Sequence, residues 1–450
     1  MKALLDRLHA KLGDLWWYSL MIFIACRSGD VIQAFIGLWL VPKYVGPDEL
    51  GAVLPLQQLS NLFAVPLAVL ATVFAKYVNT YATRGEYGKV KSFIHDVLWT
   101  ACGVFLICIA VAYLVIPHFY VRLNVASGML TILILVAGFA SNIANLFTAA
   151  LQGLKKFKTM TIQNLISAPI RLATLLVAMP IRALSGYILG QATPPATCSL
   201  LAAYSLHTDL KNIPADTSWR KDLPEIWRYL WPVGLYMTLS ALCASVTTTV
   251  YRQRLPEIES AAYYLLSRFA EIASYVGTSM AVILFPLASE AHERRHERIK
   301  ILHNTIAATL VISFSMTVAF VFLAPSLLSI DTSWAAYKNY AGILPILTLI
   351  AGLGTIISAM TSYEMACQRF SVAISASIFN LTWTTVLVCL TGYAFFEGIL
   401  PSLFFSILKS IRLENLATLS YVTLGVYACQ TIILYIVVFH NHKRDAINHD

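Results

Sequence analysis

The amino-acid sequence predicts an all-α polytopic membrane protein with about twelve transmembrane helices in two parallel six-helix repeats. The first observation is composition: of 450 residues, 58% are hydrophobic and only 12% are charged. The mean hydropathy is +0.69. Soluble domains carry about 25% charged residues, so the composition excludes a soluble protein. No G-x-x-x-x-G-K-[ST] phosphate loop is present, which excludes a built-in ATPase of that type.

The second observation is the spacing of the apolar stretches. A helix needs about 20 apolar residues to cross a bilayer. Stretches of that length, separated by short polar segments, predict twelve spans at residues 15–41, 50–75, 93–116, 128–151, 160–181, 185–206, 230–251, 261–286, 304–324, 339–362, 370–395 and 416–439. The stretch 396–415 is too polar at its end for a span, and we expect it at the membrane interface.

The distribution of Lys and Arg predicts the orientation of these spans. With a cytoplasmic N-terminus, inner segments hold 21 of the 32 basic residues, outer segments hold eight, and Arg27, Arg171 and Arg268 lie within spans. An excess of Lys and Arg on the cytoplasmic side is typical of membrane proteins, so both termini are predicted to be cytoplasmic. The net charge of +9 is therefore interpreted as a topology signal and a contact with anionic lipids, not as a nucleic-acid site.

The third observation is an internal repeat. A shift of 209 residues lays the turn 46–49 over 255–258 and the basic loop 84–91 over 293–300, with six spans in the same orientation in each half. We expect an N-terminal lobe at 1–207, a cytoplasmic linker at 208–229 and a C-terminal lobe at 230–450. Trp219 and Trp227 suit an interfacial helix in the linker.

Two charges inside the first span form the first candidate site. Arg27 and Asp30 stand at i,i+3, so they either neutralise each other within the bundle or line a polar cavity. The repeat places Tyr236 and Leu239 at the equivalent positions, so helix packing alone does not require charges there. This favours Arg27 as an anion-binding residue, with Asp30 as its orienting partner or as a coupling acid.

Other spans carry polar residues on one helical face. Intramembrane cations that face a cleft indicate an anionic substrate group, because guanidinium holds phosphate bidentately and stays charged. The predicted substrate-binding residues are Arg27, Arg171, Arg268, Tyr264, Tyr275, Asn145, Asn164 and Gln57, and the predicted ion-coupling residues are Asp30 and Glu271. The alternatives are an Arg268–Glu271 pair that only neutralises itself, and small or hydroxylated residues that serve helix packing alone.

No metal site or cofactor is predicted. His292–His296 matches H-E-x-x-H, in which two histidines bind zinc, but both central residues are arginines and the motif lies on a basic cytoplasmic loop. The eight cysteines lie in or beside spans without C-x-x-C spacing, so they are interpreted as packing residues.

Two short runs carry a resemblance to a known family. The run Pro42–Gly51 resembles the "L-G-P-x-x-[YL]-G" turn of bacterial polysaccharide flippases, and Leu151–Phe157 resembles their short basic loop. Together with the two six-span repeats, the chain resembles the multidrug/oligosaccharidyl-lipid/polysaccharide (MOP) exporter superfamily. Within it, the resemblance is to the polysaccharide transporter branch of Wzx-like oligosaccharide flippases.

The resemblance implies a two-lobe bundle of the MATE or MOP type in the bacterial cytoplasmic membrane, which flips a polyprenyl-diphosphate-linked oligosaccharide from the inner to the outer leaflet by alternating access. Related lipid flippases bind diphosphate with arginines on helices one and eight, which Arg27 and Arg268 match. Their further arginine on helix two has no counterpart here. Asp30 resembles the first-helix aspartate that drug exporters use for H⁺ or Na⁺ coupling.

Two alternatives remain at this point. One is a cation-coupled multidrug antiporter of the same superfamily, which would favour acidic residues in its cleft; against the three arginines stand Asp30, Glu271 and, at a span end, Glu364. The other is a membrane glycosyltransferase, polymerase or ligase, which the short outer loops disfavour. The sequence therefore favours a transporter that is not an enzyme, with membrane lipids and a lipid-linked oligosaccharide as its partners.

Overall fold

The computed structural model describes residues 29–123, 128–154, 156–290, 295–366, 369–390 and 415–447. These residues are overwhelmingly helical and contain no strand. The helices are α2 (Val41–Tyr44), α3 (Pro47–Leu50), α4 (Val53–Thr83), α5 (Tyr87–Leu123), α6 (Gly128–Gly153), α7 (Phe157–Ala178), α8 (Ala183–Leu210), α9 (Leu223–Arg254), α10 (Glu257–Glu290), α11 (Arg295–Leu327), α12 (Thr332–Ala335), α13 (Leu344–Ala366), α14 (Phe370–Leu390) and α16 (Leu416–Ile447), with a π-helix η1 (Ile36–Leu40) and the 3-10 helices η2 (Thr217–Asp222) and η4 (Lys338–Ile343).

The predicted fold class is confirmed. Every predicted span after the first coincides with a described helix, and the first span is helical from residue 29 onward. Within the described ranges, seven helical stretches are long and apolar enough to cross a membrane. The predicted interfacial stretch 396–415 lies outside the described residues except at its last position.

The chain forms two compact units. Unit 1 contains Met1–Ile36 and Leu59–Met237, and unit 2 contains Gly37–Gln58 and Thr238–Asp450. The first span, α4 and α9 therefore each contribute to both units. The lobe boundaries expected from the sequence, at residues 207 and 230, stay a prediction.

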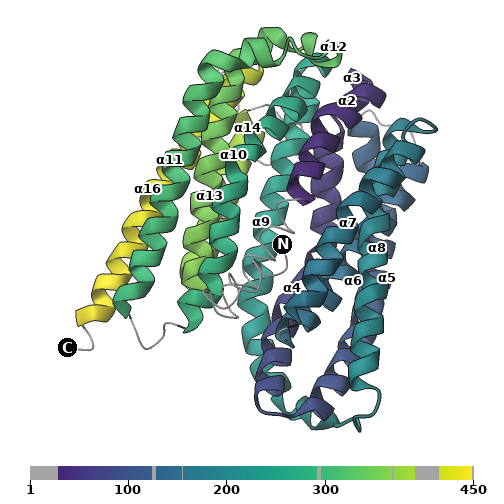
Figure 1. Ribbon diagram of the computed structural model, residues 1–450. Helices are drawn as coiled ribbons and strands as arrows, with labels where there is room; N and C mark the ends of the chain where they lie inside the picture. Colours follow the sequence, from purple (N-terminus) through teal and green to yellow (C-terminus); the bar gives the residue numbers. More distant parts are fainter. Residues whose placement is uncertain are drawn as a thin grey trace, which may run out of the picture. The chain divides into compact units, whose positions relative to one another are not determined.

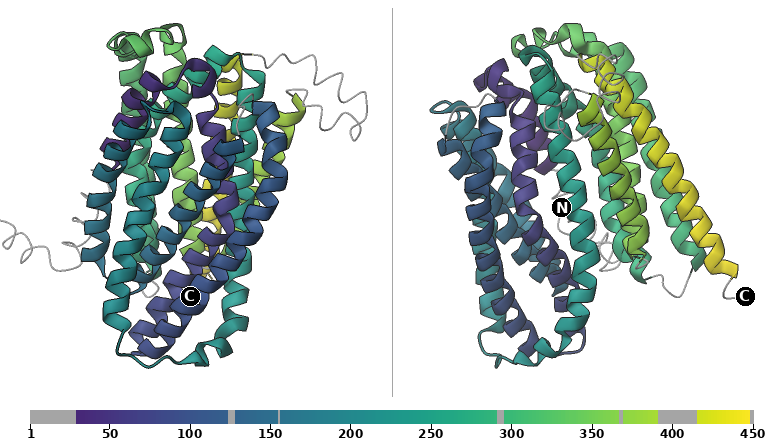
Figure 2. Two further views of the ribbon diagram at one scale, coloured as in Figure 1. Left: turned by 90° about the vertical axis from the view of Figure 1, so that its right-hand side faces the viewer. Right: turned by 180° about the vertical axis from the view of Figure 1, so that it is seen from behind.

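Unit 1 is a bundle in which α6 packs against α5 and α8, and α7 packs against α8 (Figures 1 and 2). Aromatic side chains fill its core near the linker end of α4 and α5. The ring of Phe93 lies 4.9 Å from the ring of Trp219, which is only 7% exposed. The interfacial interpretation of Trp219 is therefore corrected: its apolar ring is buried in the core, whereas Trp227 is exposed.

The linker is tied to unit 1 by polar contacts as well. Tyr81 donates a hydrogen bond of 2.8 Å to Asp222, and Arg220 forms an ion pair of 2.9 Å with Asp96. Asp216 caps η2, and hydrogen bonds from Ser218 hold the pKa of the Asp216 carboxyl below its usual value. The linker is thus part of a packed unit over these residues.

Unit 2 is centred on α13, which packs against α10, α11, α14 and α16. The fully buried Trp334 of α12 donates its indole N–H to the carbonyl of Leu38 at 2.7 Å. Leu38 lies in the π-helix, where the wider turn displaces the regular backbone hydrogen-bond pattern. A tryptophan distant in sequence therefore holds the irregular turn of the first span.

One contact in unit 2 bears directly on the repeat. Gly51 and Ser260 are 209 positions apart, the predicted repeat offset, and the Ser260 hydroxyl donates to the Gly51 carbonyl at 3.4 Å. The two positions that the predicted offset equates therefore lie in contact. A β-carbon at Gly51 would lie 2.4 Å from the Ser260 Oγ, so this position requires glycine.

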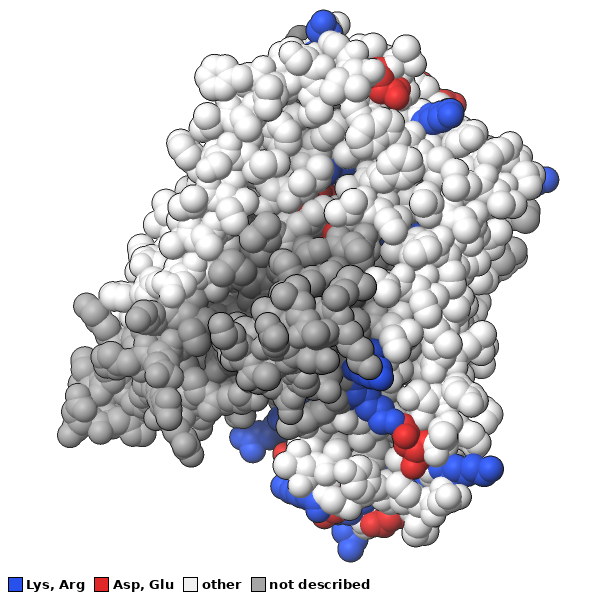
Figure 3. All heavy atoms as spheres, viewed as in Figure 1, with Lys and Arg blue, Asp and Glu red and all other residues white. Residues whose placement is uncertain are grey.

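On the visible face, most charged side chains lie near the ends of the helices (Figure 3). On the face seen in Figure 3, the Lys, Arg, Asp and Glu side chains of unit 1 gather near one end, and the surface over α7 and α8 is almost free of them. The uncharged band is the surface that a lipid bilayer requires.

Candidate functional site

The strongest polar cluster of unit 2 is centred on Arg268 of α10. One guanidinium nitrogen donates to both carboxylate oxygens of Glu271, at 2.7 and 2.9 Å, and the other donates to the side-chain oxygen of Gln57. The Arg268 side chain is 11% exposed and that of Glu271 is 37% exposed. Because the spacing is i,i+3 on one helix, the pair forms without help from any other element.

The rest of the Arg268 side chain is enclosed. The guanidinium lies 5.2 Å from the ring centroid of Tyr264, which is fully buried. A β-carbon at Gly37 would lie 3.3 Å from the Arg268 Cδ, so the π-helical turn approaches the arginine closely because residue 37 is glycine. Tyr264 therefore supports the arginine here and offers no exposed face for a sugar to stack on.

Tyr275, the second predicted aromatic residue, lies two turns along α10 from Arg268, or roughly 10 Å. Its side chain is half-buried. The structure thus brings together Arg268, Glu271, Gln57 and Tyr264 in unit 2, and it places Tyr275 on the same helix but farther along.

The second cluster lies in unit 1 around Arg171 of α7. One guanidinium nitrogen donates to the side-chain oxygen of Gln33 at 2.5 Å. The Nε of Arg171 is buried and has no hydrogen-bond partner. Among the described residues, no carboxylate forms an ion pair with Arg171. This arginine is therefore held by a neutral amide alone.

The local sequence explains how Arg171 reaches Gln33. Residues 29–35 are helical, and Gly29 lies against Ala168 of α7, so the first span and α7 approach each other closely here. Pro169, two residues before Arg171, lies inside α7 and lacks the N–H of a regular helical hydrogen bond. Both features position the guanidinium against the first span.

Other predicted residues of unit 1 lie around this cluster or apart from it. Asp30 is half-buried, one helical turn from Gln33, and Asn164 is half-buried two turns before Arg171. Asn145 is exposed on α6, and no hydrogen bond among the described residues joins it to Arg171. Arg27 lies outside the described residues.

Gln33 escaped the sequence interpretation, and Glu364 entered it only as an acid at a span end. Gln33 is the partner of Arg171, and its amide within an apolar span was the available signal. Glu364 near the end of α13 is fully buried, and it forms an ion pair with Arg369, at 3.5 Å between Nη1 and Oε1. Its position at a span end concealed that burial. The Arg171 cluster and the Arg268 cluster thus each place a charged side chain inside a predicted membrane span.

Within the described residues, no group of three or more His, Cys, Asp and Glu side chains is arranged to hold a metal ion. The H-E-x-x-H stretch falls largely on residues 291–294, which lie outside the described ranges. Cys102, Cys108, Cys198, Cys243 and Cys429 are free.

The fold is that of MOP superfamily transporters. The chain is similar to an inward-facing multidrug resistance MATE family transporter of that superfamily, with a TM-score of 0.68 and 14% identity over 94% of this chain and 99% of the other. It is also similar to a MATE protein in complex with MaL6, with a TM-score of 0.68 and 12% identity over 96% of this chain and 97% of the other.

A third similar structure is a MOP superfamily transporter from Pyrococcus furiosus, whose binding pocket of reversed polarity suggests a different function for that protein. Its TM-score is 0.65, with 13% identity over 96% of each chain. The sequence matches no protein-family model and no curated protein. The class defined by fold and hydropathy is a multi-pass helical membrane protein of MOP architecture.

Proposed function

We propose that this protein is a membrane transporter that moves an anionic amphiphile, a polyprenyl-diphosphate-linked oligosaccharide, from the inner to the outer leaflet of the bacterial cytoplasmic membrane. The observation that carries this proposal is Arg171, a half-buried cation on a predicted membrane-spanning helix, which donates to the neutral amide of Gln33 and forms no ion pair with a carboxylate among the residues that the structure describes. The MOP architecture supports transport as the activity, and nothing in the proposal requires an enzymatic step.

The physical argument concerns the energy of an uncompensated charge. An arginine at the centre of a membrane helix costs at least about 2.5–3.5 kcal/mol, and a carboxylate or phosphate partner offsets that cost. Arg171 has no such partner among the described residues, so a bound anion supplies the missing charge. The planar guanidinium suits a diphosphate because it donates two parallel hydrogen bonds to phosphate oxygens.

The two clusters take different roles in this proposal. Arg171, together with Arg27, receives the diphosphate, while Asn164 and Asn145 of the same unit contact the sugars. Arg268 is neutralised by Glu271, whose carboxylate is 37% exposed and therefore accessible to a coupling ion. Protonation of Glu271 would release Arg268 to the substrate. Asp30 is the corresponding candidate for H⁺ or Na⁺ coupling in unit 1.

The cycle is alternating access between an N-terminal lobe at 1–207 and a C-terminal lobe at 230–450, joined by the linker 208–229. The basic segments of the sequence support cytoplasmic termini. The polyprenyl chain stays in the bilayer while the diphosphate and sugars cross through the polar interior.

The test is complementation of a bacterial strain that lacks its polysaccharide flippase. Arg171→Ala should reduce complementation at least about tenfold, because a buried charged contact to substrate is worth about 2–5 kcal/mol. Arg84→Ala is the matched control, since Arg84 is an exposed cation on a loop of the same unit. Full complementation by Arg171→Ala, at wild-type protein levels, would refute the anion site.

A second candidate function is a cation-coupled multidrug antiporter. Two observations favour it: Arg268 is neutralised by Glu271, and Glu364 is a fully buried carboxylate in unit 2. A structure of a multidrug resistance MATE transporter is among the similar proteins. Efflux of a cationic dye from proteoliposomes, abolished by Glu364→Gln and indifferent to added lipid-linked oligosaccharide, would select this function.

A further inference from the structure

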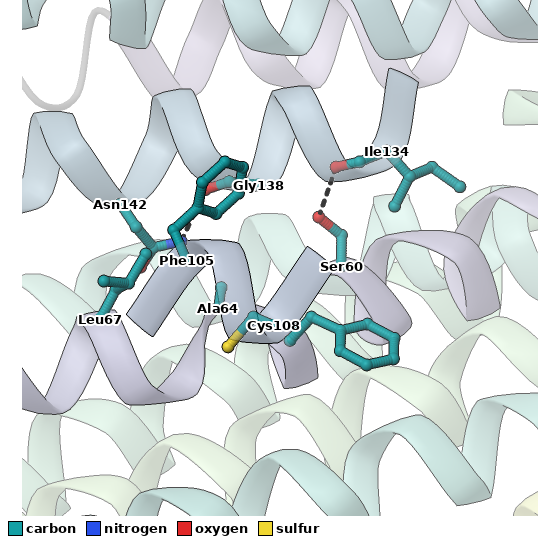
Figure 4. A pocket seen from close by; sticks show the side chains of 9 residues that line it. Ser60, Ala64, Leu67, Phe105, Cys108, Ile134, Gly138 and Asn142 are labelled. Carbon is teal, nitrogen blue, oxygen red and sulfur yellow. Dashed lines mark hydrogen bonds between the residues drawn. The ribbon is translucent and has the colours of Figure 1, made fainter. Parts of the chain in front are cut away.

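Two polar side chains inside unit 1 illustrate how a helical bundle satisfies such groups. The Ser60 hydroxyl donates to the carbonyl of Ile134 at 3.5 Å, and the Asn142 amide donates to the carbonyl of Gly138 at 2.7 Å (Figure 4). A backbone carbonyl accepts a hydrogen bond and has no proton to pass on. Each of these hydrogen bonds is therefore a closed structural contact.

Unit 2 contains a row of polar side chains of another kind. On α10, Glu259, Tyr263, Ser267 and Glu271 follow one another at intervals of four residues. Residues with this spacing are neighbours on a helix, about 5–6 Å apart between β-carbons, so the four side chains form one line. The line begins roughly 3 Å along α10 from its first residue and ends roughly 21 Å along it. Two carboxylates thus stand at the ends of the row, with two hydroxyls between them.

The two hydroxyls of this row differ from those in closed structural contacts. The Tyr263 hydroxyl lies within hydrogen-bonding reach of Ser267, and both side chains are half-buried. In the part of the chain that the structure describes, neither hydroxyl donates to a backbone carbonyl. By contrast, the Ser274 hydroxyl on the same helix donates to the carbonyl of Glu271 at 2.7 Å. The hydroxyls of Tyr263 and Ser267 can therefore pass a proton along the row.

A second aromatic ring holds Tyr263 in place. The rings of Tyr251 and Tyr263 stack with their centroids 4.5 Å apart. The Tyr251 hydroxyl lies 2.8 Å from Oγ1 of Thr423, and the Thr423 hydroxyl donates to the carbonyl of Leu419 at 2.8 Å. Because Thr423 donates its one proton to that carbonyl, Tyr251 is the donor to Thr423, and this chain closes on the backbone. Tyr251 therefore positions the ring of Tyr263 without joining the row.

Glu259 stands at the end of the row that is nearer to water. It lies in the first turn of α10, it is half-buried, and its Oε2 accepts the backbone N–H of Leu416 at 2.7 Å. Under the orientation that the basic residues predict, this end of α10 faces outward. A proton from the outer solution therefore meets Glu259 before the deeper members of the row.

The surroundings of the row contain few charges. Residues 304–327 of α11 and 344–362 of α13, two helices that pack along α10, contain no ionisable side chain. In the described ranges, Arg268 is the charged side chain that contacts Glu271, so a proton competes with this cation for the carboxylate. The other ionisable side chains on described elements beside the outer half of α10 are Asp48 and Glu49 of α3, Arg252 of α9, Tyr340 of η4, and Tyr421 and Tyr427 of α16.

We propose that Tyr263 and Ser267 form a proton route along α10, from Glu259 to Glu271. The inference rests on the proposed function in taking Glu271 as the coupling acid. A proton bound by Glu259 passes to the hydroxyl of Tyr263. Tyr263 gives its own proton to Ser267, which in turn protonates Glu271, and steps longer than a hydrogen bond pass through one water molecule. Each hydroxyl ends with one proton, and Glu271 gains the proton that Glu259 took from water.

The route makes the state of Arg268 depend on the proton concentration of the outer solution. A neutral Glu271 no longer balances the charge of Arg268, so the guanidinium becomes available to a substrate phosphate. A proton on Glu271 and an anion at Arg268 therefore favour each other's binding. The coupling ion of this mechanism is H⁺, because protons move by exchange between hydroxyls while Na⁺ needs an open passage.

The experiment follows the protonation of Glu271 directly. Full-length protein in lipid nanodiscs receives protons that a laser flash releases from a caged-proton compound, and time-resolved infrared spectroscopy records the C=O stretch of protonated carboxyl groups. The band that is missing in Glu271→Gln is assigned to Glu271. Tyr263→Phe removes one hydroxyl of the row and keeps the ring that stacks on Tyr251, and Ser267→Ala removes the other hydroxyl.

Both variants should slow the rise of the Glu271 band at least about tenfold, because a positioned proton-transfer group typically contributes roughly 10²–10⁴-fold. The final amplitude should equal that of the wild type, since the route changes the rate and not the equilibrium. Glu259→Gln should also slow the band, while it keeps an acceptor for the N–H of Leu416. The matched control is Tyr251→Phe, which removes a buried hydroxyl from the neighbouring ring and should leave the rate unchanged.

Three results would overturn the proposal. Absence of a Glu271 band in the wild type, at every pH at which the protein stays folded, would show that this carboxylate takes no proton. An unchanged rate in Tyr263→Phe and Ser267→Ala would show that the proton arrives through the exposed side of Glu271. Equal slowing in Tyr251→Phe would assign the effect to the packing of the two rings. Unfolding temperatures are measured first, and either row variant replaces the other where one does not fold.

The failure of this route and the failure of the proposed function are distinguishable. If Arg171→Ala abolishes complementation but Tyr263→Phe and Ser267→Ala protonate Glu271 at the wild-type rate, the route fails and the transport proposal stands. If these two variants slow the protonation while Arg171→Ala complements fully, the route stands and the diphosphate site fails.

Discussion

Arg171 in unit 1 and Arg268 in unit 2 are the same residue type in similar apolar helices, yet their partners differ. Arg268 donates to the carboxylate of Glu271 and to the amide of Gln57, while the partner of Arg171 among the described residues is the amide of Gln33. A carboxylate neutralises the charge, and an amide only orients it. The comparison shows that one neighbouring carboxylate separates the two arginines, and in the proposed function this difference leaves Arg171 open to an anion while Arg268 is neutralised.

The largest expected effect comes from giving Arg171 a carboxylate of its own. Gln33→Glu keeps the shape of the side chain and places a negative charge at the atom that already accepts the Arg171 hydrogen bond at 2.5 Å. We expect transport, measured by complementation, to fall by about two orders of magnitude, because a charge-assisted pair worth about 1.5–3 kcal/mol competes with the substrate. Thermal stability should be unchanged or higher.

The matched control for Gln33→Glu is Gln33→Leu, which removes the amide without adding charge. It should retain more transport than Gln33→Glu, since Arg171 stays positive and open. If both substitutions reduce complementation equally, the role of Gln33 is to position the arginine. The absence of a carboxylate beside Arg171 would then not be what permits transport.

The reverse change is Glu271→Gln, which converts the Arg268 cluster into one like that of Arg171. We expect a loss of stability of about 1–3 kcal/mol, since the hydrogen bonds at 2.7 and 2.9 Å lose their charge. The upper figure for buried pairs does not apply, because Glu271 is 37% exposed. Thermal unfolding in detergent measures the loss.

The same variant should gain an affinity for anions. Pyrophosphate is expected to raise the unfolding temperature of Glu271→Gln more than that of the wild type, because Arg268 then lacks its neutralising partner. The double variant Arg268→Met/Glu271→Leu removes both charges and should recover most of the stability without responding to pyrophosphate. An equal rise in unfolding temperature with pyrophosphate in all three proteins would show that Glu271 does not keep Arg268 from binding an anion.

The smallest effects come from two glycines of the first span. A β-carbon at Gly37 would lie 3.3 Å from the Arg268 Cδ, whereas one at Gly29 would lie 3.9 Å from the Ala168 Cβ. Gly37→Val should therefore destabilise the protein by about 1–2 kcal/mol through overpacking against the arginine. Gly29→Ala, at an ordinary contact distance, should change stability by less than about 0.5 kcal/mol. Unfolding temperatures of the two variants give the difference, and equal values would mean that Arg268 moves aside.

Much of the fold was predictable because its signals are local or periodic. A long apolar stretch specifies a helix in a bilayer, because a helix pairs all of its backbone N–H and C=O groups within one segment. The Arg268–Glu271 pair was visible as an i,i+3 spacing on one helix. The offset of 209 residues was visible as a repeat in the sequence, and Gly51 and Ser260, which this offset equates, lie in contact.

The partners that lie far apart in sequence were not predictable. Nothing in the sequence placed Gln33 beside Arg171, 138 positions away, or Gln57 beside Arg268, 211 positions away. Trp219 was expected in an interfacial helix because tryptophan favours that position. Its side chain is buried instead, because its segment packs onto the core of unit 1.

The sequence by itself therefore determined that the protein is a helical membrane protein of two repeats with three arginines inside its spans. Hydropathy, charge asymmetry and residue spacing are properties of the chain, and each acts within one helix. Only the tertiary structure decided which arginine is neutralised and which is held by an amide. Those outcomes depend on which side chains of distant helices meet, and the electrostatic state of a buried charge depends on the groups within a few ångströms of it.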